Sequence, residues 1–283
     1  MKIYFCAAVA AAAVLFSGCS SHKWWPDVDS QEECRKLQVE GQKFEQVGHI
    51  STAHIIGITA GLGPYIAERY ALFSQAPDQL VMKYAAIPVS IWGTLLPWEL
   101  QYRHDVTAVL HSLHGGGPEE VQKRRDRLEA IAKEYVERND RKEDWKTGFI
   151  IHALGDSYAH TYRYEGEGTY AYGQWTGHLC RRGLYHPDSI KENLDNYLGY
   201  IDALYRVYNT GMGDEEAFRR FRSFVKDAAA KPIDDEQINK LIDDYNIGMM
   251  SKINYCEHEI WAEAIDYQNV KGFLEQLRAE LES

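Results

Sequence analysis

From about residue 30 onward, the apolar positions of the chain recur mostly with the period of an amphipathic helix. "DVTAVLHSLHGGG" predicts a helix that ends at three glycines, and Pro118 opens the next helix, "PEEVQKRRDRLEAIAKEYVERND". Three more helices are predicted in "DSIKENLDNYLGYIDALYRVYN", "DEEAFRRFRSFVKDAAA" and "DDEQINKLIDDYNIGMMSKI". Each of these three begins with an aspartate that can cap free backbone amides. No run of alternating β-branched residues predicts a sheet, so the expected fold class is all-α.

Two segments lack this periodicity. Residues 74–98 contain three prolines, and residues 162–188 are rich in glycine and tyrosine. Long irregular segments in a compact domain are usually functional or disordered. The aromatic content of the second segment argues against disorder, which leaves a functional loop or an aromatic loop packed on the helices.

The N-terminus has the pattern of an export signal. A basic residue, Lys2, precedes a short apolar run, and small residues lead to Cys19. This pattern predicts a lipoprotein with a signal peptide over 1–18, an acylated Cys19, a tether over 19–30 and a single helical domain over 31–283. Phe16 stands where leucine is usual, and Ser20 favours sorting to the outer membrane, facing the periplasm. An ordinary cleaved signal or a single N-terminal anchor are the alternatives.

The charge and cysteine content narrow the choice of partners. The formal net charge is −11, and it becomes −12 once Lys2 leaves with the signal, which disfavours nucleic acid as a partner. No later segment approaches the roughly 20 apolar residues of a membrane helix, so the membrane is expected as a partner only through the lipid anchor. Cys34, Cys180 and Cys256 allow at most one disulfide and leave one thiol.

The segment "HALGDSYAHT" carries the candidate chemistry. If Asp144 caps a helix over 145–161, His152, Asp156 and His160 fall within about 80° of its circumference. The apolar residues around them indicate that this helix is buried. Burying a carboxylate and two imidazoles without partners costs several kcal/mol, roughly, and a bound metal ion removes that cost. The alternative is a buried hydrogen-bond network.

Other histidines could complete a metal site. If residues 99–114 are helical, His104, His111 and His114 also lie within about 80° of one another. His49 and His54 are about 140° apart on a helix, so only one of them is expected to face a shared site.

Acidic groups and a later loop add further candidates. Asp78 lies at the proline-marked end of a predicted helix, in "SQAPDQ". His178 and His186 lie in the Gly/Tyr-rich segment, followed closely by Asp188.

HxxxD followed by another histidine on a buried helix, in an exported all-helical protein, resembles the zinc-dependent phospholipase C family and the related fungal single-strand nucleases. The order of "GHISTAHIIGITAGL", "SQAPD", "LHGG", "HALGDSYAHT" and "GHL" before "PD" also resembles an uncharacterised bacterial family. The likeness to this bacterial family covers roughly residues 45–205. The phospholipase resemblance implies a single multi-helix, phospholipase C-like domain with zinc or a similar divalent cofactor. The metal ligands that it implies are His49, Asp78, His111 or His114, His152, Asp156, His160 and His178.

The chain departs from the phospholipase pattern in two places. The free N-terminal tryptophan that is a metal ligand in the family is replaced by the predicted lipidated Cys19. The family's final HxxxE is also absent, because Arg182 follows His178 and Ile190 follows His186 at that spacing. Asp188 could substitute, and a site for one or two metal ions is expected.

The resemblance implies an envelope-anchored phosphoesterase that acts on phospholipid headgroups or other phosphodiesters. In this hypothesis Asp78 is the general base, and Tyr158, Tyr162 and Tyr172 line the substrate pocket. The alternative is a non-catalytic binding or immunity-type lipoprotein, with a protein partner and a structural or vestigial metal site.

We predict that the mature chain begins at an acylated Cys19. Mass spectrometry of the mature N-terminus should show the added mass of a diacylglyceryl group, and Cys19→Ser should mislocalise the protein. An unmodified N-terminus at any other residue would contradict the prediction.

Overall fold

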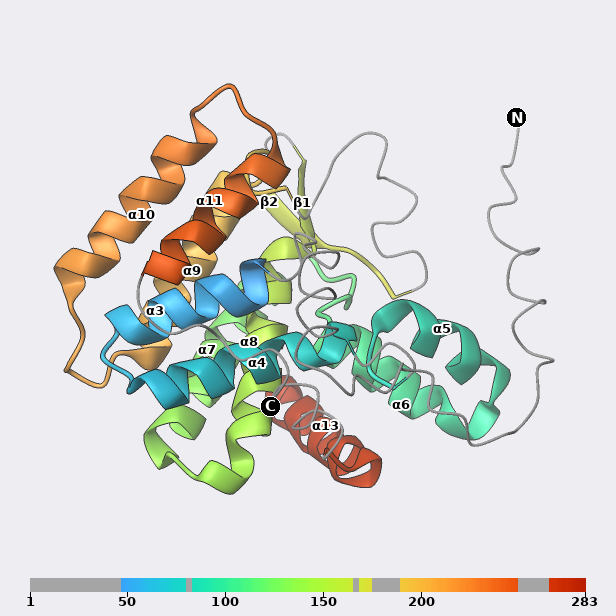
Figure 1. Cartoon of the computed structure of the whole chain (residues 1–283). Helices are drawn as coiled ribbons and strands as arrows, with labels where there is room; N and C mark the ends of the chain where they lie inside the picture. The colour runs from blue at the N-terminus through green and yellow to red at the C-terminus, as the bar shows by residue number, and fades with distance from the viewer. Residues whose placement is uncertain (1–46, 80–82, 165–167, 175–188, 249–264) are drawn as a thin grey trace, which may run out of the picture. The chain divides into compact units, whose positions relative to one another are not determined.

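The computed structural model describes residues 47–79, 83–164, 168–174, 189–248 and 265–283. All of them belong to one unit of the chain, Glu40–Ser283, and the fold is mostly helical (Figure 1). The predicted signal, Cys19, the tether, the three mature cysteines, His178 and His186 lie outside the described residues. Within the described residues, no helix is both long enough and apolar enough to cross a lipid bilayer.

The N-terminal half of the described chain consists of helices of very different length. They are η1 (Val47–Thr52, a π-helical turn), α3 (Ala53–Thr59), α4 (Pro64–Gln79), α5 (Ala86–Leu95), η2 (Pro97–Glu99), α6 (Leu100–His104), η3 (Asp105–Leu110, also π-helical) and α7 (Pro118–Arg138). Pro118 starts α7 as predicted, and Glu119 and Glu120 occupy its first turn, where they favour the positive end of the helix dipole.

The described residues of the second half form a short turn, one long buried helix, a hairpin and four further helices. These elements are η4 (Arg141–Glu143), α8 (Asp144–Ala159), β1 (Thr161–Tyr164), β2 (Gly168–Ala171), α9 (Leu194–Tyr208), α10 (Glu215–Ala229), α11 (Asp235–Gly248) and α13 (Tyr267–Glu282). The predicted aspartate caps are confirmed for α10 and α11, where Asp214 accepts from the Ala217 amide and Asp234 from the Gln237 amide, each at 2.9 Å.

Helix α8 is the centre of the fold, and most of its residues are buried. It lies along α4 and also contacts α7 and α9 (Figure 1). The close approach of α4 depends on Gly148, because a Cβ built there would lie only 2.3 Å from the Cβ of Phe73. A helix surrounded on several sides needs apolar residues around most of its circumference, which explains "FIIHALG".

Three expectations about local structure were wrong. Asp144 does not cap α8; it is buried, and its Oδ2 accepts from Nε of Arg69 on α4 at 2.5 Å. The helix expected over 99–114 ends at Leu110, before Ser112, whose φ is 51°. Residues 74–98, expected to be irregular, contain the end of α4 and all of α5.

The Gly/Tyr-rich segment also differs from its predicted irregular form. Residues Thr161–Ala171 include an antiparallel hairpin, in which Tyr162 pairs with Tyr170 and the two rings stack at 5.9 Å. Tyrosine and threonine favour strands, and cross-strand aromatic pairs stabilise them. The hairpin is the only sheet within the described part of the chain.

We predict that Gly148→Ala destabilises the fold by about 1–3 kcal/mol, because the added methyl group overlaps Phe73. Gly272→Ala is the matched control: Gly272 lies in α13 with open space around it, so alanine there should stabilise by about 0.4–1 kcal/mol. Thermal or urea unfolding of both variants measures the difference. Equal stability of the two would contradict the assigned packing of α4 on α8.

Candidate metal centre

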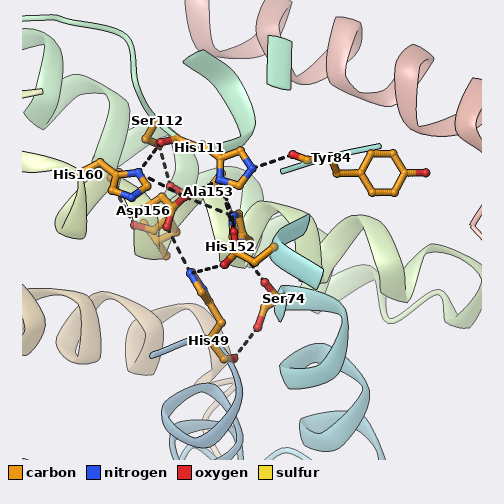
Figure 2. Close-up of polar contacts among 12 residues, drawn as sticks. His49, Ser74, Tyr84, His111, Ser112, His152, Ala153, Asp156 and His160 are labelled. Atoms are coloured by element: carbon orange, nitrogen blue, oxygen red, sulfur yellow. Dashed lines mark hydrogen bonds and ion pairs between the residues drawn. The ribbon is translucent and has the colours of Figure 1, made fainter. Parts of the chain in front are cut away.

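The buried face of α8 presents His152 and Asp156 one helical turn apart. Nε2 of His152 lies 3.2 Å from Oδ2 of Asp156, and both residues are buried. His152 and Asp156, two of the three residues of the predicted stripe, therefore lie on the buried face of α8 (Figure 2), whereas His160 follows the last residue of the helix.

His49 reaches this stripe from η1. Its Nε2 lies 3.3 Å from Oδ1 of Asp156, and its ring stacks on that of His152 at 4.2 Å. Gly155 leaves room for the ring, because a Cβ there would lie 3.0 Å from Cε1 of His49. His54, the alternative candidate, faces elsewhere, and its Nδ1 lies 2.6 Å from Oδ1 of Asn246.

His111 completes the cluster from the end of η3. Its Nδ1 lies 3.0 Å from Oδ2 of Asp156 and 3.1 Å from Nε2 of His152. The chain turns sharply at Ser112, whose hydroxyl donates to the Ala153 carbonyl at 2.9 Å and fixes the turn against α8 (Figure 2).

The outer ring nitrogens of two histidines are held by backbone carbonyls. Nε2 of His111 lies 2.8 Å from the Tyr84 carbonyl, and Nδ1 of His152 lies 2.8 Å from the Ser74 carbonyl. A carbonyl can only accept, so these outer nitrogens carry the hydrogens. Histidines that bind metals are commonly oriented in this way.

The inner nitrogens of the same two rings therefore face each other as lone pairs whenever both rings are neutral. At 3.1 Å, with the Asp156 carboxylate alongside, two lone pairs repel. The arrangement requires a positive species between them: either a proton on one ring or a metal cation. Within the described residues this is the strongest physical indication of a cation site.

Asp78, at the end of α4, closes the solvent side of the cluster. Its carboxylate oxygens lie 3.8 Å from Nε2 of His49, 3.8 Å from Nδ1 of His111 and 3.9 Å from Nε2 of His152. Its side chain is 20% exposed. The ligand atoms of a tetrahedral zinc with bonds of about 2.0–2.1 Å lie roughly 3.3 Å apart, close to the spacings seen here.

Two overlapping groups of side chains could thus hold a metal ion. One consists of His49, Asp78 and His152, and the other of His111, His152 and Asp156. In each group the candidate ligand atoms lie within 4.8 Å of one another. Imidazole and carboxylate together suit zinc and other divalent transition metals.

The electrostatics agree with a cation-seeking site. Burial would raise the pKa of Asp156, but the neighbouring His160 and His152, with a hydrogen bond from His111, hold it well below its usual value. Burial would lower the pKa of His111, yet the bond to Asp156 raises it to about 9. Burial lowers the pKa of His152, as expected for a ring that stays neutral and can bind a metal ion.

The remaining candidate histidines lie outside the two groups. His160 follows α8, and its Nδ1 is 2.8 Å from the His111 carbonyl and 3.5 Å from Asp156, so it supports both residues. His114 accepts from the Gly116 amide, and burial with two nearby arginines lowers its pKa to about 4. His104 is partly exposed beside Asp105. The second helical stripe of histidines does not form, because η3 ends before His111.

The tyrosines proposed to line a pocket occupy different places. Tyr158 packs against Tyr200, and the guanidinium of Arg125 lies 4.0 Å from its ring centroid. Tyr162 and Tyr172 contact each other on the hairpin, with ring centroids 4.8 Å apart. The Tyr172 amide donates to the His160 carbonyl at 3.1 Å, which places the hairpin next to the cluster. Their role in substrate binding stays a prediction.

The backbone groups that orient the cluster were not predicted. The carbonyls of Ser74 and Tyr84 carry no side-chain signal that a sequence pattern could reveal. The Ser74 hydroxyl also donates to the His49 carbonyl at 2.5 Å, so one serine joins two of the histidines.

The fold and the site together define a helical protein with a buried His/Asp cluster able to hold a metal ion. No protein-family model matches the chain, and no curated protein or solved structure shows significant similarity to it.

We predict that the metal-free protein loses stability between about pH 6.5 and pH 9. The pKa of His111 is about 9 in the folded state against about 6.5 when unfolded. Its stabilising proton is thus fully bound below pH 6.5 and lost as the pH rises through 9. Burial would lower the pKa of His49, but Asp156 raises it, so the proton of His49 adds to the same decline, whereas burial lowers the pKa of His54 and His152.

The measurement is the melting temperature of the chelated protein across this pH range. Asp156→Asn removes the carboxylate that raises the pKa of His111, so the decline should flatten in that variant. A wild-type melting temperature that stays constant or rises over the interval would refute the assignment.

Proposed function

We propose that the protein is a metal-dependent phosphodiesterase attached to the bacterial envelope, facing the periplasm. The observation that carries the proposal is the convergence of inner nitrogens of His49, His111 and His152 on the carboxylates of Asp156 and Asp78. Zinc is the preferred ion for this donor set. When bound, it would supply Lewis acidity and lower the pKa of a coordinated water.

The residues of the cluster have different roles in this proposal. The backbone carbonyls of Tyr84 and Ser74 fix the orientations of the His111 and His152 rings. The nearly inaccessible carboxylate of Asp156 supplies the negative charge beside these rings. Asp78 is the more accessible carboxylate, with oxygens 3.8–3.9 Å from three histidines. It can therefore receive a proton from an attacking water while the other groups hold their positions.

The substrate class rests on two features of the sequence. The HxxxD pattern followed by a further histidine on one helix resembles zinc-dependent phospholipase C, whose fold the proposal extends to this chain. The predicted acyl anchor at Cys19 keeps the domain beside phospholipids. Phospholipid headgroups are therefore the first phosphodiesters to test.

A second candidate is a non-catalytic binding or immunity-type lipoprotein that acts on a protein partner. It is favoured by the closed inner part of the cluster, where the side chains of His111, His152 and Asp156 are 5% exposed or less. A zinc site with four protein ligands is structural, whereas a catalytic site keeps an open position. The two candidates differ in whether Asp78 is a fourth ligand or a base beside an open position.

The test uses metal analysis followed by hydrolysis of nitrophenyl-phosphorylcholine. The purified protein should contain zinc or a similar ion, and added zinc should raise its melting temperature. Hydrolysis should depend on the metal, and Asp78→Asn should lower it by about 10²–10⁴-fold while metal is retained. His104→Gln, a partly exposed histidine outside the cluster, is the matched control and should keep full activity.

Two outcomes would overturn parts of this proposal. Metal binding without hydrolysis of any phosphodiester would replace the enzyme with the binding protein. A protein that neither contains metal nor gains stability from zinc would reduce the cluster to a protonated hydrogen-bond network.

A further inference from the structure

Helix α5 and the turn after it expose a row of large apolar side chains. Ile87, Ile91 and Leu95 are spaced four residues apart and are 50%, 46% and 59% exposed. Four-residue spacing places them on one face of the helix. Trp98 in η2 and Leu100 at the start of α6 are also exposed, by 73% and 46%. We call these five residues the α5 face.

The α5 face lies in an uncharged part of a highly charged protein. Residues 84–98 contain no Asp, Glu, Lys or Arg, although such residues make up 26% of the chain. Glu99, the first charge after them, is already bonded to Lys271 of α13 at 2.9 Å. The face therefore offers a protein partner no charge to complement, and a group of exposed large apolar side chains near one another in sequence is a candidate interaction site.

We propose that the α5 face docks the domain on a lipid bilayer by inserting into its interface. Ten helical residues extend about 15 Å, half the roughly 30 Å of the hydrocarbon core, so α5 can lie in the interface but cannot span it. Tryptophan is enriched at membrane interfaces, and Trp98 is the most exposed member of the face.

The predicted anchor makes the bilayer the occupant most available to this face. An acylated Cys19 lies 28 residues before Val47, a separation that an extended chain spans with at most about 95 Å. Such an anchor keeps the domain beside the membrane but does not determine which surface of the domain contacts the bilayer. Insertion of the α5 face would determine that orientation.

Docking would also orient the candidate metal centre. Tyr84, two residues before α5, holds His111 through its carbonyl. The face and the cluster are thus connected by a short, bonded piece of backbone. The inference concerns docking alone and stands whether or not the cluster hydrolyses phosphodiesters.

Depth-dependent fluorescence quenching tests the proposal on the full acylated chain. The protein is reconstituted in phosphatidylethanolamine/phosphatidylglycerol vesicles with and without brominated acyl chains. Because the anchor is present in every variant, differences in quenching between variants report how the domain itself contacts the bilayer. The chain has seven tryptophans, so Trp98→Phe should remove a quenchable component of up to about one-seventh of the emission. Leu95→Glu should reduce the same component by expelling the face from lipid.

Met212→Glu is the matched control, because Met212 is 79% exposed and lies outside the α5 face; its quenching should equal that of wild type. The quenching should persist at high salt, since the net charge of −12 without Lys2 gives no attraction to anionic lipid for salt to screen. Far-UV circular dichroism should be unchanged in all variants.

The measurements distinguish a failure of docking from a failure of catalysis. Leu95→Glu should hydrolyse soluble nitrophenyl-phosphorylcholine as wild type does and vesicle phospholipid more slowly; a wild type without activity still leaves the quenching result decisive. Unchanged quenching in both Trp98→Phe and Leu95→Glu would overturn the proposal. A detergent-solubilised dimer that Ile91→Glu dissociates, with no quenching of Trp98, would identify a second copy as the occupant and also overturn it.

Discussion

The buried carboxylate of Asp156 sets the constraint that organises this domain. A carboxylate in the core is costly unless positive charge or hydrogen-bond donors surround it. Here Nε2 of His49, Nδ1 of His111 and Nε2 of His152 all lie within 3.3 Å of its oxygens. These histidines come from η1, the end of η3 and α8. The charge balance of one side chain therefore ties together segments more than one hundred residues apart in sequence.

Small residues and bent helices allow these segments to meet. Gly148 admits α4 and Gly155 admits the ring of His49, so α8 can be approached closely on two sides. The π-helical turns η1 and η3 each lead to or contain a ligand candidate, and irregular helical turns are frequent at functional sites. The chain therefore departs from regular α-helical geometry in η1 and η3, near the points where His49 and His111 face Asp156.

The sequence predicted what depends on short-range periodicity. The stripe of His152 and Asp156 follows from a spacing of four residues on one helix, and the structure contains it. His111 could be singled out from its neighbours only in three dimensions, because η3 stops at Leu110 and Ser112 adopts a left-handed backbone. Helix α5 was missed because the three prolines of residues 74–98 suggested a loop. Pro88, the third residue of the helix, sits where the backbone N–H needs no helical acceptor.

The hydrogen-bond directions in the cluster are stronger evidence for a cation site than the residue types are. Any group of histidines and aspartates can neutralise itself by sharing protons, so composition alone does not indicate a metal. The carbonyls of Ser74 and Tyr84 fix the hydrogens on the outer nitrogens and turn two lone pairs toward each other. A proton occupies that space only while the pH keeps one of the two rings protonated. A divalent ion there would be held by histidine nitrogens together with the carboxylates of Asp78 and Asp156. Asp78, whose side chain is 20% exposed, is then the carboxylate through which the buried cluster contacts solvent.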